Sequence, residues 1–234
     1  MKAVRIHRYG DAGVLSLDDV PQPAYGDDDV LIRVVAAGVN PVDWKIREGY
    51  LKNAVPHRLP LTLGWDVSGV VAAVGRSVRT FKPGDLVYSR PDIARDGCYA
   101  EFVAVRASEV APRPSTISHV AAATLPLAGI TAWQAIVETA QVTTGQRVLI
   151  HAAAGGVGSL AVQLAKWRDA HVIATASAAN ADLVSFLGAD EVIDYRRERF
   201  FERAQGVDVV FDTVGGQVQQ DSWRTLKPGG LLVS

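Results

Sequence analysis

The sequence AAAGGVG at residues 152–158 has the residue types and the spacing of a loop that binds a dinucleotide. It is the fingerprint Gly-x-Gly-x-x-Gly with alanine in place of the first glycine, between a strand-like apolar run and a stretch with helical spacing. A small residue suits the tight turn, the central glycine lets backbone N–H groups approach a pyrophosphate, and the last glycine lets the helix pack closely on the strand. The free N–H groups and the dipole at the helix start attract phosphate, whereas a tight turn without a ligand is the alternative. The residues expected to bind the cofactor here are Ala153, Gly155, Gly156, Val157 and Gly158.

The end of the next strand-like run indicates which dinucleotide is bound. An NAD enzyme places Asp or Glu there to hold the ribose 2′-hydroxyl, but residues 175–177 are Thr, Ala and Ser. A carboxylate would repel the extra phosphate of NADP(H), so its absence favours NADPH, with NADH as the alternative. Ser177 and Asn180 can donate hydrogen bonds to that phosphate, and Tyr195 follows the next strand with two arginines behind it. For the arginines, a solvated charged segment is the alternative interpretation.

The elements that must position this loop change character along the chain. Residues 1–118 contain short alternating strand-like runs separated by turn residues, which is typical of a barrel-like or sandwich-like unit. Residues 119–234 alternate between continuous apolar runs and helical stretches, which predicts parallel strands covered on both faces. The fold class is therefore α/β, with a doubly wound second domain. In such a fold the end of the fourth strand contacts the adenosine side, which adds Thr213, Val214 and Gly215 to the expected cofactor contacts.

Composition excludes several classes of protein. A net charge of −1 over 234 residues offers no electrostatic attraction for nucleic acid or an acidic membrane surface. A single cysteine excludes an internal disulfide and a multi-cysteine metal site. The charged N-terminus has no signal-peptide pattern, and no apolar run is long enough for a membrane span, so we expect a cytoplasmic protein. Ser234 closes an apolar run at the edge of a strand, and we expect the second domain to be C-terminally incomplete.

Several segments together resemble the medium-chain dehydrogenase/reductase superfamily, and more narrowly its zinc-independent quinone oxidoreductase and enone reductase branch. They follow one another in the family's order and cover almost the whole chain. The segments are AAGVNPVDWKIREG (36–49), LGWDVSGVVAAVG (63–75), FKPGDLVY (81–88), YAEFVAV (99–105), LPLAGITAWQAI (125–136), VLIHAAAGGVGSLAVQLAK (148–166), LGADEVIDY (187–195) and DVVFDTVGG (208–216).

The resemblance implies a GroES-like catalytic domain at residues 1–118 and an NADP(H)-binding Rossmann domain at residues 119–234. It also implies an active site in the cleft between the domains, and a homodimer or homotetramer. Zinc-dependent members carry ligands at the positions of Asn40 and Trp65, and neither residue type binds zinc. We therefore expect no metal.

The same resemblance assigns the candidate catalytic residues. Asn40 is expected to hydrogen-bond the substrate or the nicotinamide ribose, and Lys45 to contact the ribose or polarise a carbonyl oxygen. Tyr50 can donate a proton or stack on a quinone, and Trp65 can form a wall of the acceptor pocket. Thr131 matches a residue that touches nicotinamide in relatives. Each has a structural alternative: Trp65 as a core residue, for example, and Tyr50 as a surface residue.

Without a metal, the expected reaction is hydride transfer from NADPH to a small-molecule acceptor, either a quinone or an α,β-unsaturated carbonyl, both of which delocalise the arriving charge. Two other enzyme classes remain open, an NADP-linked reductase of enoyl thioesters and an alcohol dehydrogenase-like enzyme. The alternative of another class is an NADPH-binding structural or regulatory protein with little turnover.

Overall fold

A computed structural model describes all 234 residues. The chain forms two compact units, Met1–Leu127 (unit 1) and Ala128–Ser234 (unit 2). The change of sequence pattern after residue 118 lies nine residues before this division, because α2 (His119–Ala122) packs against the β3 and β5 strands of unit 1 (Asp29–Ala37 and Val67–Val74). No helix is long and apolar enough to cross a membrane.

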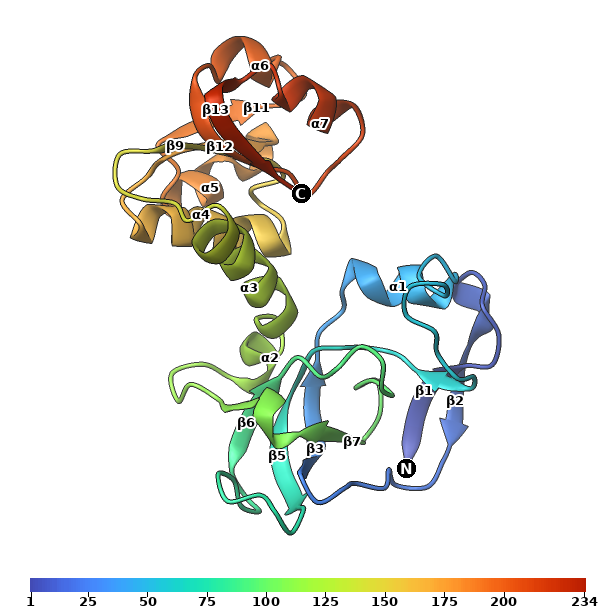
Figure 1. Ribbon diagram of the computed structural model, residues 1–234. Helices are drawn as coiled ribbons and strands as arrows, with labels where there is room; N and C mark the ends of the chain where they lie inside the picture. The colour runs from blue at the N-terminus through green and yellow to red at the C-terminus, as the bar shows by residue number, and fades with distance from the viewer. The chain divides into compact units, whose positions relative to one another are not determined.

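Unit 1 is built from two antiparallel sheets. The three-stranded sheet has the order β2 (Leu15–Asp19), β1 (Lys2–Ile6), β4 (Leu61–Thr62). The five-stranded sheet has the order β7 (Phe102–Arg106), β3, β5, β6 (Leu86–Ser89), β8 (Val110–Pro112). Figure 1 shows α1 (Pro41–Arg47) after the end of β3.

Two separate apolar cores stabilise unit 1. One lies on the five-stranded sheet and includes Val30, Ile32, Val71 and Val103. The other packs around Trp65 and consists of Ile6, Ile46, Leu61, Leu63 and Trp65, with partly buried neighbours. The second core joins α1 to the small sheet, so it fixes the helix that carries several candidate site residues.

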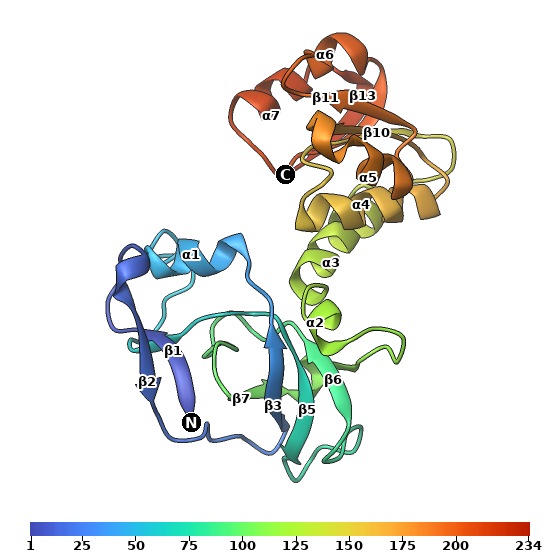
Figure 2. The ribbon, with the colours of Figure 1, turned by 180° about the vertical axis from the view of Figure 1, so that it is seen from behind.

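Unit 2 contains one parallel sheet with helices on both faces. Its strand order is β11 (Glu191–Asp194), β10 (His171–Ala176), β9 (Arg147–Ile150), β12 (Val207–Phe211), β13 (Leu226–Val233). In both views, α4 (Gly156–Trp167) and α5 (Ala181–Phe186) cover one face and α6 (Phe200–Arg203) and α7 (Gln217–Ser222) the other (Figures 1 and 2). The helix α3 (Pro126–Trp133) continues as a π-helical turn at residues 134–139. The expected α/β fold class is confirmed.

The continuous apolar strands of unit 2 follow from this double coverage. Val148 and Ile150 of β9 face the core beneath α4, whereas Leu149 between them faces the core beneath α6. The central strand β9 pairs with β10 on one side and β12 on the other, so the strand order reverses at β9. In a doubly wound sheet, the carboxyl ends of the strands at this reversal form the ligand-binding edge.

Candidate functional site

The glycine loop connects β9 to α4 at the reversal of strand order. Gly155 is the N-cap of α4, and its N–H donates to Ala152 O at 2.9 Å. A Cβ at Gly158 would lie 2.3 Å from Ala152 O, so only glycine allows this approach of helix and loop. A Cβ at Gly156 would meet nothing within 4 Å. The loop is therefore closely packed on its inner side and open where a ligand would approach.

A cavity of about 590 Å³ lies at this edge of the sheet, entirely within unit 2. It is lined by parts of the glycine loop and by the segments after β10, β11 and β12. The sequence-predicted residues that line it are Gly155, Ser177, Asn180, Tyr195 and Val214. The sequence-predicted cofactor residues that do not line it are Thr131, Ala153, Gly156, Val157, Gly158, Thr213 and Gly215. Of these, Ala153 is buried and Thr131 is exposed on α3.

The loop after β12 is shaped by a buried carboxylate that sequence analysis did not single out. Asp212 is almost fully buried, and its Oδ1 accepts hydrogen bonds from Val214 N at 2.8 Å and Gly215 N at 3.1 Å. Gly215 and Gly216 both have positive φ, which suits glycine. Asp212 thus sets the backbone path of the predicted contacts at residues 213–215.

The region expected to receive a 2′-phosphate carries neutral donors and cations. Asn180 Nδ2 lies 3.4 Å from Ser177 Oγ, and the Arg196 guanidinium lies over the Tyr195 ring, 5.8 Å from its centroid. The carboxylate of Asp194 lies 3.8 Å from the Nε of Arg197 and accepts a hydrogen bond from the Arg196 N–H. Arg196 forms no ion pair within the chain, so its charge is free for a ligand.

A buried histidine forms part of the cavity wall, and sequence analysis did not predict it as a site residue. His151 ends the apolar run of β9 and is 1% exposed. Its Nδ1 lies 3.1 Å from Thr175 Oγ1 and its Nε2 lies 2.9 Å from Ser222 Oγ. Burial lowers the pKa of His151 to about 4, so the ring is neutral near pH 7. The available sequence signal is a histidine directly after a buried strand and before the glycine loop.

In unit 1, Asn40 connects two buried carboxylates. Its backbone N–H donates to Asp43 Oδ2 at 2.6 Å, and its Nδ2 donates to Asp66 Oδ2 at 2.8 Å. Tyr99 OH also donates to Asp43 Oδ2, at 2.7 Å, and Leu127 N donates to Asp66 Oδ1, at 2.7 Å. We call Asn40, Asp43, Asp66 and Tyr99 the Asn40 cluster.

The carboxylates of the Asn40 cluster titrate abnormally. Burial raises the pKa of Asp66 to about 6, although the bonds from Asn40 and Leu127 oppose the shift. Burial also raises the pKa of Asp43, whose Oδ1 has no hydrogen-bond partner. The cluster fixes Asn40 at the start of α1 and places two ionisable carboxyl groups, those of Asp43 and Asp66, in direct contact with it.

The other candidates from unit 1 fall into two environments. Lys45 and Tyr50 are exposed; Tyr50 packs edge-on against Trp44, with 5.8 Å between the ring centroids, and Lys45 Nζ lies 5.9 Å from the centroid of the Trp44 ring. Trp65 is 0% exposed and belongs to the second apolar core of unit 1. Its placement within unit 1 is that of a core residue, and its expected contact with an acceptor stays a prediction.

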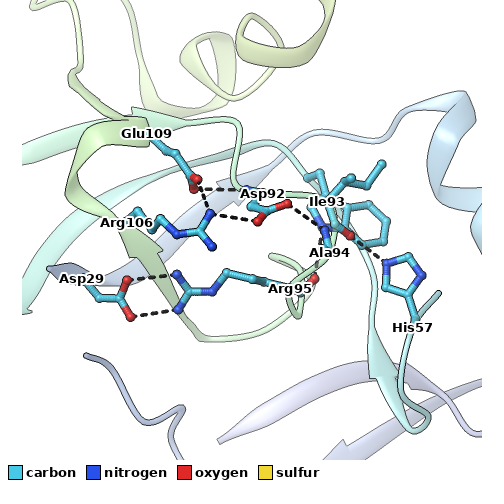
Figure 3. Close-up of polar contacts among 9 residues, drawn as sticks. Asp29, His57, Asp92, Ile93, Ala94, Arg95, Arg106 and Glu109 are labelled. Atoms are coloured by element: carbon cyan, nitrogen blue, oxygen red, sulfur yellow. Dashed lines mark hydrogen bonds and ion pairs between the residues drawn. The ribbon is translucent and has the colours of Figure 1, made fainter. Parts of the chain in front are cut away.

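The loop at residues 90–97 holds the indole of Trp65. Trp65 Nε1 donates to Arg95 O at 3.3 Å, and His57 Nε2 donates to Ile93 O at 2.7 Å. Figure 3 shows how ion pairs fasten this loop: Arg95 forms two bonds to Asp29, of 2.8 and 2.9 Å, and Arg106 bridges Asp92 and Glu109. Its pairing with Arg95 lowers the pKa of Asp29, so this ion pair persists over the physiological pH range.

Comparison with known proteins agrees with this architecture. The family model described as "Alcohol dehydrogenase GroES-like domain" matches residues 26–115, and the one described as "Zinc-binding dehydrogenase" matches residues 156–234. The solved quinone oxidoreductase from Coxiella burnetii is similar with a TM-score of 0.92 and 41% identity, covering 100% of this chain and 75% of that chain.

Two curated relatives are similar in sequence. "NAD(P)H oxidoreductase RTN4IP1, mitochondrial" of Bos taurus is 39% identical over 97% of this chain and 63% of its own length. "NADPH-dependent alkenal/one oxidoreductase, chloroplastic" of Arabidopsis thaliana is 40% identical over 100% of this chain and 62% of its own length. The chain thus spans less than two thirds of these relatives. It belongs to the medium-chain dehydrogenase/reductase superfamily, in its quinone oxidoreductase-like branch.

The donors of this chain do not fit the zinc ion named in one family description. Asn40 donates its amide N–H to a carboxylate, and the Trp65 indole has no lone pair to offer. The structure contains no group of three or more His, Cys, Asp or Glu side chains arranged to hold a metal.

Proposed function

We propose that the protein is an NADPH-dependent reductase that transfers hydride to a quinone or an α,β-unsaturated carbonyl without a metal. The observation that carries this proposal is the unit 2 cavity, where the glycine loop meets the neutral donors Ser177 and Asn180. The cavity is also lined by Tyr195, whose ring lies under the guanidinium of Arg196. The names of the relatives support the same cofactor and acceptor classes.

The residues of unit 2 fit a dinucleotide. The first N–H groups of α4 have no acceptor within the helix and are available to a pyrophosphate, and a Cβ at Gly156 would meet nothing within 4 Å. Ser177, Asn180 and Arg196 supply hydrogen bonds and charge for a 2′-phosphate, and Tyr195 gives the adenosine an aromatic wall. NADPH, when bound, supplies the hydride. NADH has no 2′-phosphate, so it would make no use of the donors proposed for that phosphate.

The residues of unit 1 fit an acceptor that needs a fixed orientation and a stabilised oxyanion. The Asn40 side chain is held by Asp66 and its backbone N–H by Asp43, so ligand binding costs it little further side-chain entropy. Lys45 supplies a positive charge for a developing oxyanion, and Tyr50 supplies a hydroxyl as proton donor or an aromatic face for a quinone.

The decisive assay measures NADPH oxidation with 1,4-benzoquinone, a short enone and a crotonyl thioester. Turnover of the first two supports the proposal. Turnover of the thioester only would assign an enoyl-thioester reductase. A second assay measures NADP⁺ reduction with a primary alcohol, and turnover in that assay only would assign an alcohol dehydrogenase-like enzyme. Tight NADPH binding without turnover in either assay would assign a binding protein.

Cofactor choice has its own test at Ser177. Replacing Ser177→Asp places a carboxylate beside the proposed phosphate, and we expect NADPH affinity to fall on the order of a hundredfold while NADH affinity changes little. The matched control is Ser185→Asp on α5, which does not line the cavity. Equal losses for the two cofactors would show that Ser177 is remote from the phosphate.

A cytoplasmic location stays a prediction, since the two relatives described are mitochondrial and chloroplastic. A homodimer or homotetramer also stays a prediction.

A further inference from the structure

A chain of buried hydrogen bonds runs behind the glycine loop from Ala152 to α7. Ala152 N lies 3.3 Å from Thr175 Oγ1, which lies 3.1 Å from His151 Nδ1. His151 Nε2 lies 2.9 Å from Ser222 Oγ, and Ser222 Oγ lies 2.6 Å from Val218 O. We call this sequence of groups the His151 chain. Thr175, His151 and Ser222 are all 3% exposed or less.

The direction of every bond in the His151 chain follows from its two ends and from the neutral state of the imidazole. A backbone N–H only donates and a backbone carbonyl only accepts. Ser222 therefore gives its single proton to Val218 O and accepts from His151 Nε2, which places a proton on Nε2. Burial keeps the ring neutral near pH 7, so Nδ1 carries no proton and accepts from the Thr175 hydroxyl, which accepts in turn from Ala152 N. Each group in the chain has a hydrogen-bond partner only when its neighbours keep their donor and acceptor roles.

The first link of the chain acts on a strained residue. Ala152 has φ +48°, a conformation that favours glycine and that persists in other residues only where the surroundings hold it. Its N–H is held by Thr175 and its carbonyl accepts from Gly155 N, while Gly158 packs against that same carbonyl. The backbone from which the phosphate-facing N–H groups extend therefore depends on the position of the Thr175 hydroxyl.

The last link acts on the opposite wall of the cavity. Val218, whose carbonyl accepts from Ser222, lines the cavity on α7. The ring of Phe200 packs edge-on against His151 with 4.5 Å between centroids, and Phe200 also lines the cavity. A single imidazole thus joins the glycine loop, the end of β10 and the α6–α7 side.

We propose that His151 is a positioning residue for the dinucleotide: acting through Thr175, it holds Ala152 in its left-handed conformation and so presets the phosphate-binding N–H groups of the glycine loop. The inference rests on the proposed NADPH binding and adds to it the residue that orders the loop before ligand arrives. The neutral state that this role requires agrees with the depressed pKa of His151; the groups facing the ring are Thr175, Ser222 and Phe200, and Asp212 is the nearby charge that acts on it.

Three replacements of His151 separate its two hydrogen bonds. His151→Leu removes both, and we expect the Kd for NADPH to rise about tenfold, with kcat at saturating NADPH and benzoquinone within about twofold of the original value. His151→Asn keeps an acceptor at the place of Nδ1 and should restore most of the affinity. His151→Gln reaches towards Ser222 instead and should not. A loss confined to kcat, or equal affinities for the Asn and Gln variants, would overturn the proposal.

A second replacement tests whether the effect passes through the backbone of Ala152. Ala152→Gly removes the cost of positive φ, so His151→Leu should weaken binding less in that background than with Ala152 present. An undiminished loss would show that His151 acts by another route. If His151→Leu does not fold, Thr175→Val removes the same link with little change of shape, and the same background comparison applies.

The two proposals fail differently. If the unaltered protein does not bind NADPH in a fluorescence titration, the proposed function is wrong. If it binds NADPH and the variants bind equally well, only the role of His151 is wrong.

Discussion

The two units each bury a polar group of residues near their candidate site, but they do so with opposite chemistry. The Asn40 cluster of unit 1 is built on two carboxylates, and burial disfavours their charged form. The His151 chain of unit 2 is built on neutral groups, and burial disfavours the charged form of its one base. The comparison teaches that the Asn40 cluster accommodates charge at a cost, whereas the His151 chain excludes it.

This difference predicts opposite responses of the two units to pH. Asp66 has a folded pKa above its ordinary value, so its favourable contribution is present at low pH and is lost as pH rises through about 6. His151 has a folded pKa below its ordinary value, so its contribution is present above pH 6.5 and is lost as pH falls towards about 4. In the unaltered chain the two contributions oppose each other between pH 4 and 6.

The largest effect is expected where the inner side of the glycine loop leaves no space. Gly158→Ala forces a Cβ to within 2.3 Å of Ala152 O, and we expect the free energy of unfolding to fall by about 3 kcal/mol or more. The matched control is Gly156→Ala, where the added Cβ meets nothing within 4 Å. Chemical denaturation measures both. Equal losses for the two variants would mean that helix and loop are not in close contact.

The second effect concerns His151. In His151→Asn the titrating base is absent, so the variant should gain stability relative to the unaltered chain as pH falls from 6.5 to 4. A pKa change from 6.5 to about 4 corresponds to about 3 kcal/mol. Urea unfolding at a series of pH values measures the difference. A pH-independent difference would show that folding does not lower the pKa of His151.

A slightly smaller effect of opposite sign is expected for Asp66. Asp66→Asn should gain stability relative to the unaltered chain as pH rises from 4 to 7, by about 3 kcal/mol for a pKa change from 3.8 to about 6. The control is Asp19→Asn, because Asp19 is an exposed residue outside the cluster. If the two variants show the same pH profile, Asp66 is not desolvated in the way the structure indicates.

The smallest effect is expected on the surface of unit 1. Lys2→Met breaks the exposed ion pair with Asp19, where side-chain entropy and solvent screening leave less than about 1 kcal/mol. Differential scanning calorimetry should show a small shift of Tm that disappears at high salt. A large, salt-independent loss would contradict the contrast drawn between buried and exposed charge.

Local sequence pattern was sufficient for the fold and for the glycine loop. The alternation of apolar runs and helical stretches predicted a parallel sheet covered on both faces, and the cores above and below β9 confirm that fold class. The last glycine of the loop motif, Gly158, packs against Ala152 as the motif spacing predicted. Such features depend on residues close together in the chain.

Contacts between distant residues explain what the sequence did not show. His151 meets partners 24 and 71 residues away, and Asn40 meets Asp66 across 26 residues, so no local pattern marks either group. Thr175 was noted for the absence of a carboxylate, whereas its hydroxyl is directed inward to His151. The burial of Trp65 depends on the ion-paired loop at residues 90–97, which the sequence does not connect with it.

The fixed direction of the His151 chain also has an evolutionary consequence. A single change at residue 151, 175 or 222 leaves a buried donor or acceptor without a partner, whereas a combined change to apolar residues of similar shape removes all of them together. Neutral drift at these positions should therefore proceed in joint steps. In a selected library randomised at all three, surviving sequences should cluster into a few complete combinations, with intermediate ones depleted.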